Sequence, residues 1–139
     1  MFDDACIFCK IAQGQIPCHE IYSDEHVLAF LDIAPVAPGH TLVIPKQHYA
    51  TLFELTEDMG GRLTSALQTV GKAVMSATKA QGLNVGMNVN EAAGQLVFHA
   101  HYHLIPRFAG DGLELWPQHA ADDHEQLAKL AQAMRQSIA

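Results

Sequence analysis

The longest regular spacing of apolar residues in the chain runs from Thr56 to Gln81 and predicts an α-helix. Apolar residues recur in it at intervals of three and four positions, which places them along one side of a helix. Thr56 can cap the N-terminus, and Glu57 and Asp58 suit the positive end of the helix dipole. Gly82 is expected to end the helix in a left-handed conformation. The apolar side consists of Met59, Leu63, Leu67, Val70, Val74 and Ala77.

Five shorter apolar segments predict β-strands. Residues 34–39, between the second and third strands, form a loop because they include two prolines and a glycine. The short intervals between strands favour antiparallel pairing, with the long helix crossing between the third and fourth. The predicted strands span residues 20–23, 26–32, 41–44, 83–90 and 97–106.

Shorter helices are predicted near both ends of the chain, over residues 6–13 and 122–137. Leu127, Leu130 and Met134 share one face of the second. No repeat, low-complexity tract or long linker divides the chain. We therefore predict a single α+β domain over residues 1–139, with an antiparallel sheet of about five strands, one long crossing helix and a C-terminal helix.

The composition narrows the class of protein. Of the 139 residues, 49% are apolar and 17% are charged, which is ordinary for a soluble globular protein. The net charge of -7 disfavours binding to nucleic acid. The chain has neither an apolar run long enough to span a membrane nor the basic start and apolar stretch of a signal peptide. We expect a cytoplasmic protein that binds neither nucleic acid nor a membrane.

The three cysteines are Cys6, Cys9 and Cys18, an odd number that argues against a disulfide framework. Cys6 and Cys9 form a C-x-x-C pair, which is half of a metal site, a redox motif or two free thiols. A redox pair is expected to follow a strand and open a helix, and no strand precedes this one. A metal site is therefore favoured. Cys18 is expected to be a small buried apolar residue.

Histidine is unusually frequent, with nine residues, and three of them alternate at positions 99, 101 and 103. In a strand these three side chains share one face, about 6–7 Å apart. They could bind a transition metal, or an imidazole could act as nucleophile or acid–base group. No carboxylate lies within the triad to complete a metal site. His40, Asn90 and Gln95 lie in loops that could converge on an anion.

The segment 99–105 resembles the signature of the histidine triad (HIT) family, in which histidines alternate with apolar residues. The resemblance extends over residues 6–108, most of the chain. It is closest to the branch of histidine-triad nucleotide-binding proteins, although Ile105-Pro106-Arg107 is also similar to the fragile-histidine-triad branch. It implies a HIT-like fold and a homodimer. The other matching segments are residues 6–9 (CIFC), 28–33 (LAFLDI), 38–46 (PGHTLVIPK) and Gly94-Gln95.

The resemblance implies a nucleotide hydrolase or nucleotidyl transferase. His101 would attack the α-phosphorus of a nucleotide ester, anhydride or phosphoramidate and form a nucleotidyl-histidine, which water then releases. His103 and His40 would bind the phosphate oxygens. Gln95 would contact the scissile oxygen, and Asn90 would anchor the phosphate region. Phosphoramidates, dinucleoside polyphosphates and related nucleotide esters remain possible substrates.

The resemblance also assigns the rest of the site. Asp32 would bind the ribose hydroxyls, and His99 would lie beside the substrate. A purine is expected between Phe8, Phe30 and Ile33. Some bacterial members, and the related galactose-1-phosphate uridylyltransferases, hold zinc with two cysteines and two histidines. The equivalent set implies a closed, structural zinc site and no organic cofactor. Its members would be Cys6, Cys9, His48 and His99.

One residue departs from the family pattern. Leu96 stands where many relatives carry a serine or threonine that passes a proton to the leaving group. We therefore predict slow turnover of substrates with poor leaving groups. Two alternatives remain open. One is a nucleotide-binding regulatory module with weak turnover, and the other is a metal-dependent hydrolase with all three triad histidines as ligands. Trp116 would either reach a partner subunit's site or anchor local packing.

Overall fold

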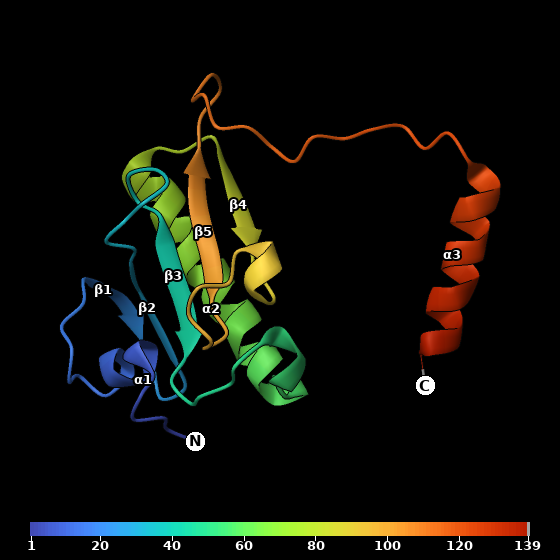
Figure 1. The fold of residues 1–139 in the computed structure, drawn as a ribbon. Helices are drawn as coiled ribbons and strands as arrows, with labels where there is room; N and C mark the ends of the chain where they lie inside the picture. The colour runs from blue at the N-terminus through green and yellow to red at the C-terminus, as the bar shows by residue number, and fades with distance from the viewer. Residues whose placement is uncertain (139) are drawn as a thin grey trace.

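A computed structural model describes residues 1–138, so the last residue of the predicted domain, Ala139, lies outside the described part. Its centre is one five-stranded antiparallel sheet in the order β1-β2-β3-β5-β4 (Figure 1). The predicted α+β fold is confirmed. The strands are β1 (Glu20–Ser23), β2 (Val27–Leu31), β3 (Thr41–Pro45), β4 (Gly82–Gly86) and β5 (Tyr102–Arg107).

The long helix α2 (Glu57–Thr78) covers one face of the sheet, behind it in Figure 1. Thr56 caps it as predicted, because its hydroxyl accepts from the Met59 N–H at 3.1 Å. The predicted C-cap at Gly82 is wrong. Lys79 takes the left-handed conformation, with φ of 61°, and Gly82 is already paired with Arg107 as the first residue of β4. The core on this face includes Val27, Ala29, Val43, Leu63, Val70, Val74 and Leu104.

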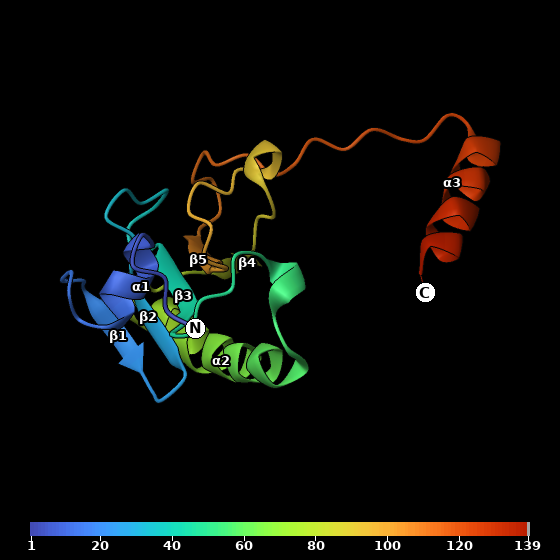
Figure 2. The same cartoon turned by 60° about the horizontal axis from the view of Figure 1, so that its bottom comes forward.

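The short helix α1 (Ile7–Ala12) packs on the opposite face of the sheet, where it covers the strands β2 and β3 (Figure 2). Phe8 and Cys9 are its buried residues, and they pack against Phe30 and Ile44. Because side chains alternate along a strand, the β5 residues next to Leu104 point to this face as well. Helix α1 leaves the β5–β4 half of this face open, and the candidate site lies around the start of β5, between α1 and this open half.

Three predicted strands, at residues 26–32, 83–90 and 97–106, are longer than the observed ones. The prediction that one strand carries the whole triad is wrong. Only His103 lies within β5. Residues 97–101 run before the strand, where the Ala100 N–H donates to the Tyr49 carbonyl rather than to a sheet neighbour. Strand β4 ends at Gly86, which pairs with His103, because the residues before His103 do not pair with β4. The chain between them makes a short 3₁₀ turn, η2 (Glu91–Ala93), and another, η1 (Leu52–Glu54), precedes α2.

The C-terminal helix α3 (His124–Ser137) forms as predicted, capped by the Asp123 carboxylate. It stands away from the rest of the chain at the end of an extended segment (Figures 1 and 2). Its apolar face is about half exposed at Leu127, Leu130 and Met134. Within the described residues, no helix is both long and apolar enough to cross a membrane.

Candidate active site

Four histidines gather at the start of β5. The ring centroids of His101 and His103 are 5.0 Å apart, and that of His40 lies 5.1 Å from His103. His40 comes from the end of the loop 33–39, directly before β3. His99 is fully buried and lies on the other side of His101, toward α1. The predicted cluster therefore forms, although a strand supplies only one of its triad members.

A backbone carbonyl fixes the proton of His101. Its Nδ1 lies 2.7 Å from the carbonyl oxygen of His99, which can only accept, so Nδ1 carries the hydrogen. The neutral ring then has its free lone pair on Nε2. Phe8 packs edge-on against the His101 ring, with the two ring centroids 5.1 Å apart, and holds the orientation of the imidazole. Burial lowers the pKa of His101, which keeps this lone pair available near neutral pH.

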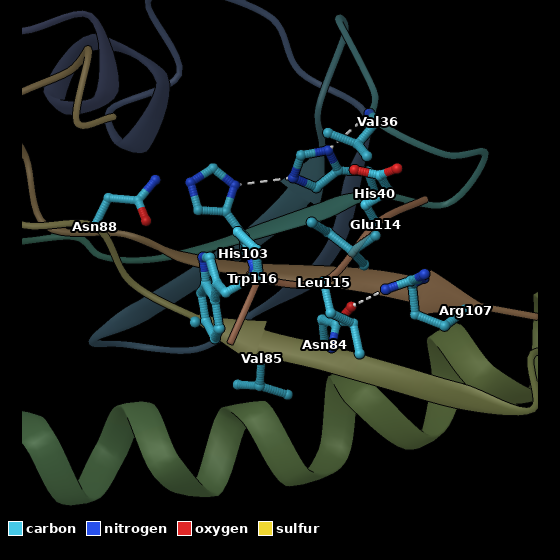
Figure 3. Close-up of a pocket in the computed structure, with 13 residues that line it drawn as sticks. Val36, His40, Asn84, Val85, Asn88, His103, Arg107, Glu114, Leu115 and Trp116 are labelled. Carbon is cyan, nitrogen blue, oxygen red and sulfur yellow. Dashed lines mark hydrogen bonds between the residues drawn. The ribbon is translucent and has the colours of Figure 1, made fainter. Parts of the chain in front are cut away.

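His103 is held by His40, and His40 by the loop before it. Nδ1 of His103 lies 2.9 Å from Nε2 of His40, and the Val36 N–H donates to Nδ1 of His40 at 3.1 Å (Figure 3). Burial lowers the pKa of both rings, that of His103 to about 4. Both imidazoles are therefore neutral at pH 7, and they can bind an anion only by donating a hydrogen bond.

A cavity of about 330 Å³ opens on the α1 side of His103. Phe8 and Phe30 form its apolar wall and pack edge-on, with ring centroids 5.7 Å apart. One oxygen of Asp32 accepts from the Ala34 N–H at 2.8 Å. The other lies 3.7 Å from Nε2 of His40, beyond hydrogen-bonding distance, and so can accept from a ligand. The structure thus brings together most of the predicted nucleoside pocket. The cavity is lined by Phe8, Phe30, Asp32, Ile33, His101 and His103, and also by Cys18, Gly94 and Leu96.

A second cavity of about 450 Å³ lies on the other side of His103 and His40 (Figure 3). Arg107 lines it but is already paired, since it donates to both oxygens of Asp111 and to Asn84. Trp116 also lines it and is 90% exposed, so it does not anchor packing within the chain.

Asn90 and Gln95 do not reach the cavities. Asn90 is exposed at the start of η2, whereas Asn88 is partly buried and lines the second cavity beside His103. Sequence reasoning missed Asn88, although it lies only two positions away. Gln95 is buried, and its amide donates to the carbonyls of Ala50 and Val97 while its oxygen accepts from the Asn90 N–H. In this arrangement Gln95 braces the loop before the triad.

The four predicted metal ligands converge beneath α1. Cys6 Sγ lies 3.4 Å from Nδ1 of His99, and Cys9 Sγ lies 3.4 Å from Nδ1 of His48. Tetrahedral zinc, with bonds of about 2.3 Å to sulfur and 2.0–2.1 Å to nitrogen, separates such ligands by roughly 3.5 Å. His99 donates from Nε2 to the Pro45 carbonyl at 2.7 Å, which leaves Nδ1 unprotonated toward the cysteines. The donor set therefore fits zinc. His99 lines neither cavity, so the predicted substrate contact does not form here.

Comparisons with known proteins agree with this geometry. The HIT domain family model matches residues 13–110. The HIT protein of Bacillus subtilis is 48% identical over 119 residues, which cover 84% of this chain and 82% of the relative. The adenosine 5'-monophosphoramidase of Schizosaccharomyces pombe is 42% identical over 103 residues, 74% of each chain.

Solved structures of similar proteins also match this chain. A crystal structure of a Streptococcus mutans protein, 44% identical, superposes with a TM-score of 0.93 over 99% of this chain and 87% of the other. A zinc-bound histidine triad family protein from Mycobacterium smegmatis, 36% identical, superposes with a TM-score of 0.75 over 93% of this chain and 97% of the other. With its fold, its four converging histidines and these matches, the chain belongs to the HIT domain family.

Proposed function

We propose that this protein is a nucleotide hydrolase or nucleotidyl transferase that forms a covalent nucleotidyl intermediate on His101. One observation carries the proposal. The His99 carbonyl holds the proton of His101 on Nδ1, so Nε2 presents a lone pair in the cavity that also contains Asp32. An unprotonated nitrogen beside a nucleoside-sized cavity is what nucleophilic attack at phosphorus requires.

In the first step, Nε2 of His101 forms a bond to the α-phosphorus, and the leaving group departs with the electron pair of its bond to phosphorus. The ring becomes cationic, and its Nδ1–H bond to the His99 carbonyl stabilises that charge. In the second step, water attacks phosphorus, the N–P bond breaks, and neutral His101, a nucleoside monophosphate and a proton result. His103 contacts the phosphoryl oxygens, and Asp32 accepts from the ribose hydroxyls. Both ring nitrogens of His40 are engaged, by His103 and by the Val36 N–H, so His40 supports His103 rather than binding the phosphate itself. Phe8, Phe30 and Ile33 hold the base, for which a purine is expected.

The named activities of relatives support this reaction class. One relative is an adenosine 5'-monophosphoramidase, and an Arabidopsis thaliana relative, 35% identical, is an adenylylsulfatase. Both names imply cleavage beside an adenylyl phosphorus. The test is intact-mass spectrometry of the native chain, quenched rapidly after mixing with adenosine phosphoramidate. A mass gain of one adenylyl group is expected, and turnover without any such gain would contradict the covalent route.

The metal-dependent alternative has less support. The Nδ1 atoms of the three triad histidines face different partners, namely the cysteines, the His99 carbonyl and His40. Among the described residues, no candidate metal cluster contains all three. Leu96 supports the other alternative, a binding module with weak turnover, because it cannot donate a proton.

Leu96→Ser provides a test of that residue. Leu96 is 86% exposed at the rim of the nucleoside cavity, so serine fits there with little cost to stability. We expect turnover of adenosine phosphoramidate to rise by about 100-fold, the lower end of what a positioned proton donor contributes. An adenylate with a good leaving group should change little. Leu96→Ala is the matched control, and equal rates for the serine and alanine variants would contradict the proposed defect.

We further propose that zinc binds Cys6, Cys9, His48 and His99 and that its role is structural. Four protein ligands leave no open position for substrate. Asp3 supports the set, because its N–H donates to Cys9 Sγ at 3.4 Å and its carboxylate lies 3.9 Å from Nε2 of His48. The protein itself then supplies the reacting groups, and no organic cofactor is needed.

We also propose that the protein is a homodimer in which the C-terminal arm, residues 112–138, packs on the partner copy. An isolated helix as short as α3 is marginal in water, so its apolar face needs a partner. A TM-score of 0.93 over 99% of the chain requires the arm, about a fifth of the residues, to be similarly placed in the Streptococcus mutans crystal structure. Helix α3 stands away from the rest of its own chain, yet the arm has a similar position in both structures. A contact with a second copy would explain that position.

The combined variant Leu127→Ser, Leu130→Ser, Met134→Ser tests the arm. Because each buried apolar side chain contributes about 1.5–3 kcal/mol, the dimer dissociation constant should rise at least about 100-fold. Analytical ultracentrifugation over a concentration series measures it. Serine at Lys129, Gln132 and Gln136, on the opposite side of the helix, is the control. An unchanged dissociation constant in the first variant would exclude the arm from the interface.

A further inference from the structure

The main-chain contact to His40 differs in kind from those to the neighbouring histidines. His99 and His101 each donate to a carbonyl, whereas His40 faces the Val36 N–H, which can only donate. Nδ1 of His40 must therefore be the acceptor. A neutral imidazole carries one hydrogen, so that of His40 lies on Nε2.

This assignment passes to the next ring. Nε2–H of His40 points at Nδ1 of His103, 2.9 Å away, so that nitrogen accepts (Figure 3). The hydrogen of His103 then lies on Nε2. With the opposite tautomers, Nδ1–H of His40 would point at the Val36 N–H, and His103 would direct a lone pair toward the phosphoryl group. A lone pair facing an anion is repulsive, whereas an N–H stabilises the charge that develops during phosphoryl transfer.

We propose that the Val36 main-chain amide is a positioning group that fixes the His40–His103 pair in the tautomer in which His103 offers Nε2–H to the phosphoryl group. The location of the protons follows from hydrogen bonding alone, and only the identity of the acceptor rests on the proposed function. The lowered pKa of both rings agrees, because a neutral pair has one proton per ring to place.

The loop is built to hold this amide still. Asp32 accepts the Ala34 N–H, and the Asp32 N–H donates to the His40 carbonyl at 2.9 Å, so the ends of the loop are tied together. The His40 N–H donates to the Ala37 carbonyl at 2.9 Å. Gly39, at φ of +95°, closes the turn, and an added Cβ there would lie 2.6 Å from Thr78. The backbone geometry of the loop, together with the Asp32 carboxylate, therefore determines where the Val36 N–H points.

The same amide affects metal binding. Asp32, His40 and His103 lie close enough to form a candidate cation site. His40 can coordinate through Nε2 only if its hydrogen moves to Nδ1, where it would meet the Val36 N–H. The amide therefore disfavours a transition metal at these three residues and keeps His40 available as a donor to His103.

Imidazole nitrogen NMR on the ¹⁵N-histidine-labelled native protein tests the assignment. Two-bond correlations distinguish a protonated ring nitrogen from one with a lone pair. We expect the Nε2–H tautomer for both His40 and His103 and the Nδ1–H tautomer for His101. An Nδ1–H tautomer at His40 or His103 would overturn the proposal, whether or not the enzyme forms a covalent adduct.

Val36→Pro removes the amide hydrogen, and Val36→Ala keeps it while shortening the side chain. The proline variant should show both tautomers at His103, with kcat lowered about 100-fold, the cost of losing one donor to a developing charge. KM should change little, and the alanine variant, which keeps the amide hydrogen, should keep the native tautomers of His40 and His103. Native tautomers together with native kcat in the proline variant would overturn the proposal. If the proline variant does not fold, the native spectrum decides.

Discussion

The His101→Gly variant is expected to form no adenylyl-protein and to lose turnover by about 10⁴-fold or more. Removing a covalent nucleophile costs a hydrolase up to about 10⁶-fold, because the remaining groups stabilise charge but cannot form the intermediate. Glycine also leaves a space between Phe8 and His103, which both adjoin the ring in the native protein. Added imidazole is expected to enter it and restore part of the turnover without labelling the protein.

The matched control is His119→Gly, which removes an exposed histidine from the extended segment before α3. It should keep the native adduct and rate. Stopped samples of the native protein and both variants, compared by intact mass and by released nucleoside monophosphate, separate the possible outcomes. An adduct that persists in the His101 variant would move the nucleophile to another residue. Near-native turnover without any adduct would favour attack by water.

Cys9→Ser is expected to release the metal and lower Tm by about 10 °C or more. Loss of a structural metal typically removes several kcal/mol, and 1 kcal/mol corresponds to roughly 2–8 °C in domains near this size. Cys9 is fully buried, and its sulfur lies near both His48 and His99, so serine also leaves a poor ligand at the centre of the site. Metal content by mass spectrometry and thermal unfolding with and without a chelator measure the two effects.

Cys18→Ser is the control for the loss of a thiol, since Cys18 is half-buried at the edge of the 330 Å³ cavity and apart from the metal cluster. It should keep one zinc per chain and a chelator-sensitive Tm. Native protein purified without metal, and with a Tm that chelator does not change, would contradict the zinc proposal.

The proposed metal site and the proposed nucleophile are linked through His99. Its ring faces the cysteines while its carbonyl holds the proton of His101, so a shift of this residue disturbs both. We therefore expect the Cys9→Ser variant to lose activity as well as stability, although four protein ligands would leave the proposed zinc no open position for substrate.

Much of this protein follows from the order of its residues. The spacing of apolar residues predicts α2 and its Thr56 cap, because helix periodicity and capping are local properties. The short apolar segments predict five strands, because a preference for extended structure is also local, and the short intervals between them favour antiparallel pairing. The motif around His99, His101 and His103 indicates the family, and the domain match confirms it. The resemblance also names Asp32, Phe8 and Phe30, which the fold brings to one cavity.

Tertiary contacts decided the remainder. Strand ends depend on having a neighbour, so β5 begins at Tyr102 and two of the triad histidines lie outside it, contrary to the alternation pattern. Lys79 ends α2 because Gly82 is required in the sheet. Which ring nitrogen carries the proton depends on partners that are distant in sequence for His99 and His103. For His101 and His40 the partner is two or four residues away, but the fold of that segment sets its direction. These partners meet only after folding, so residue order alone indicates which groups react but not how each one is held.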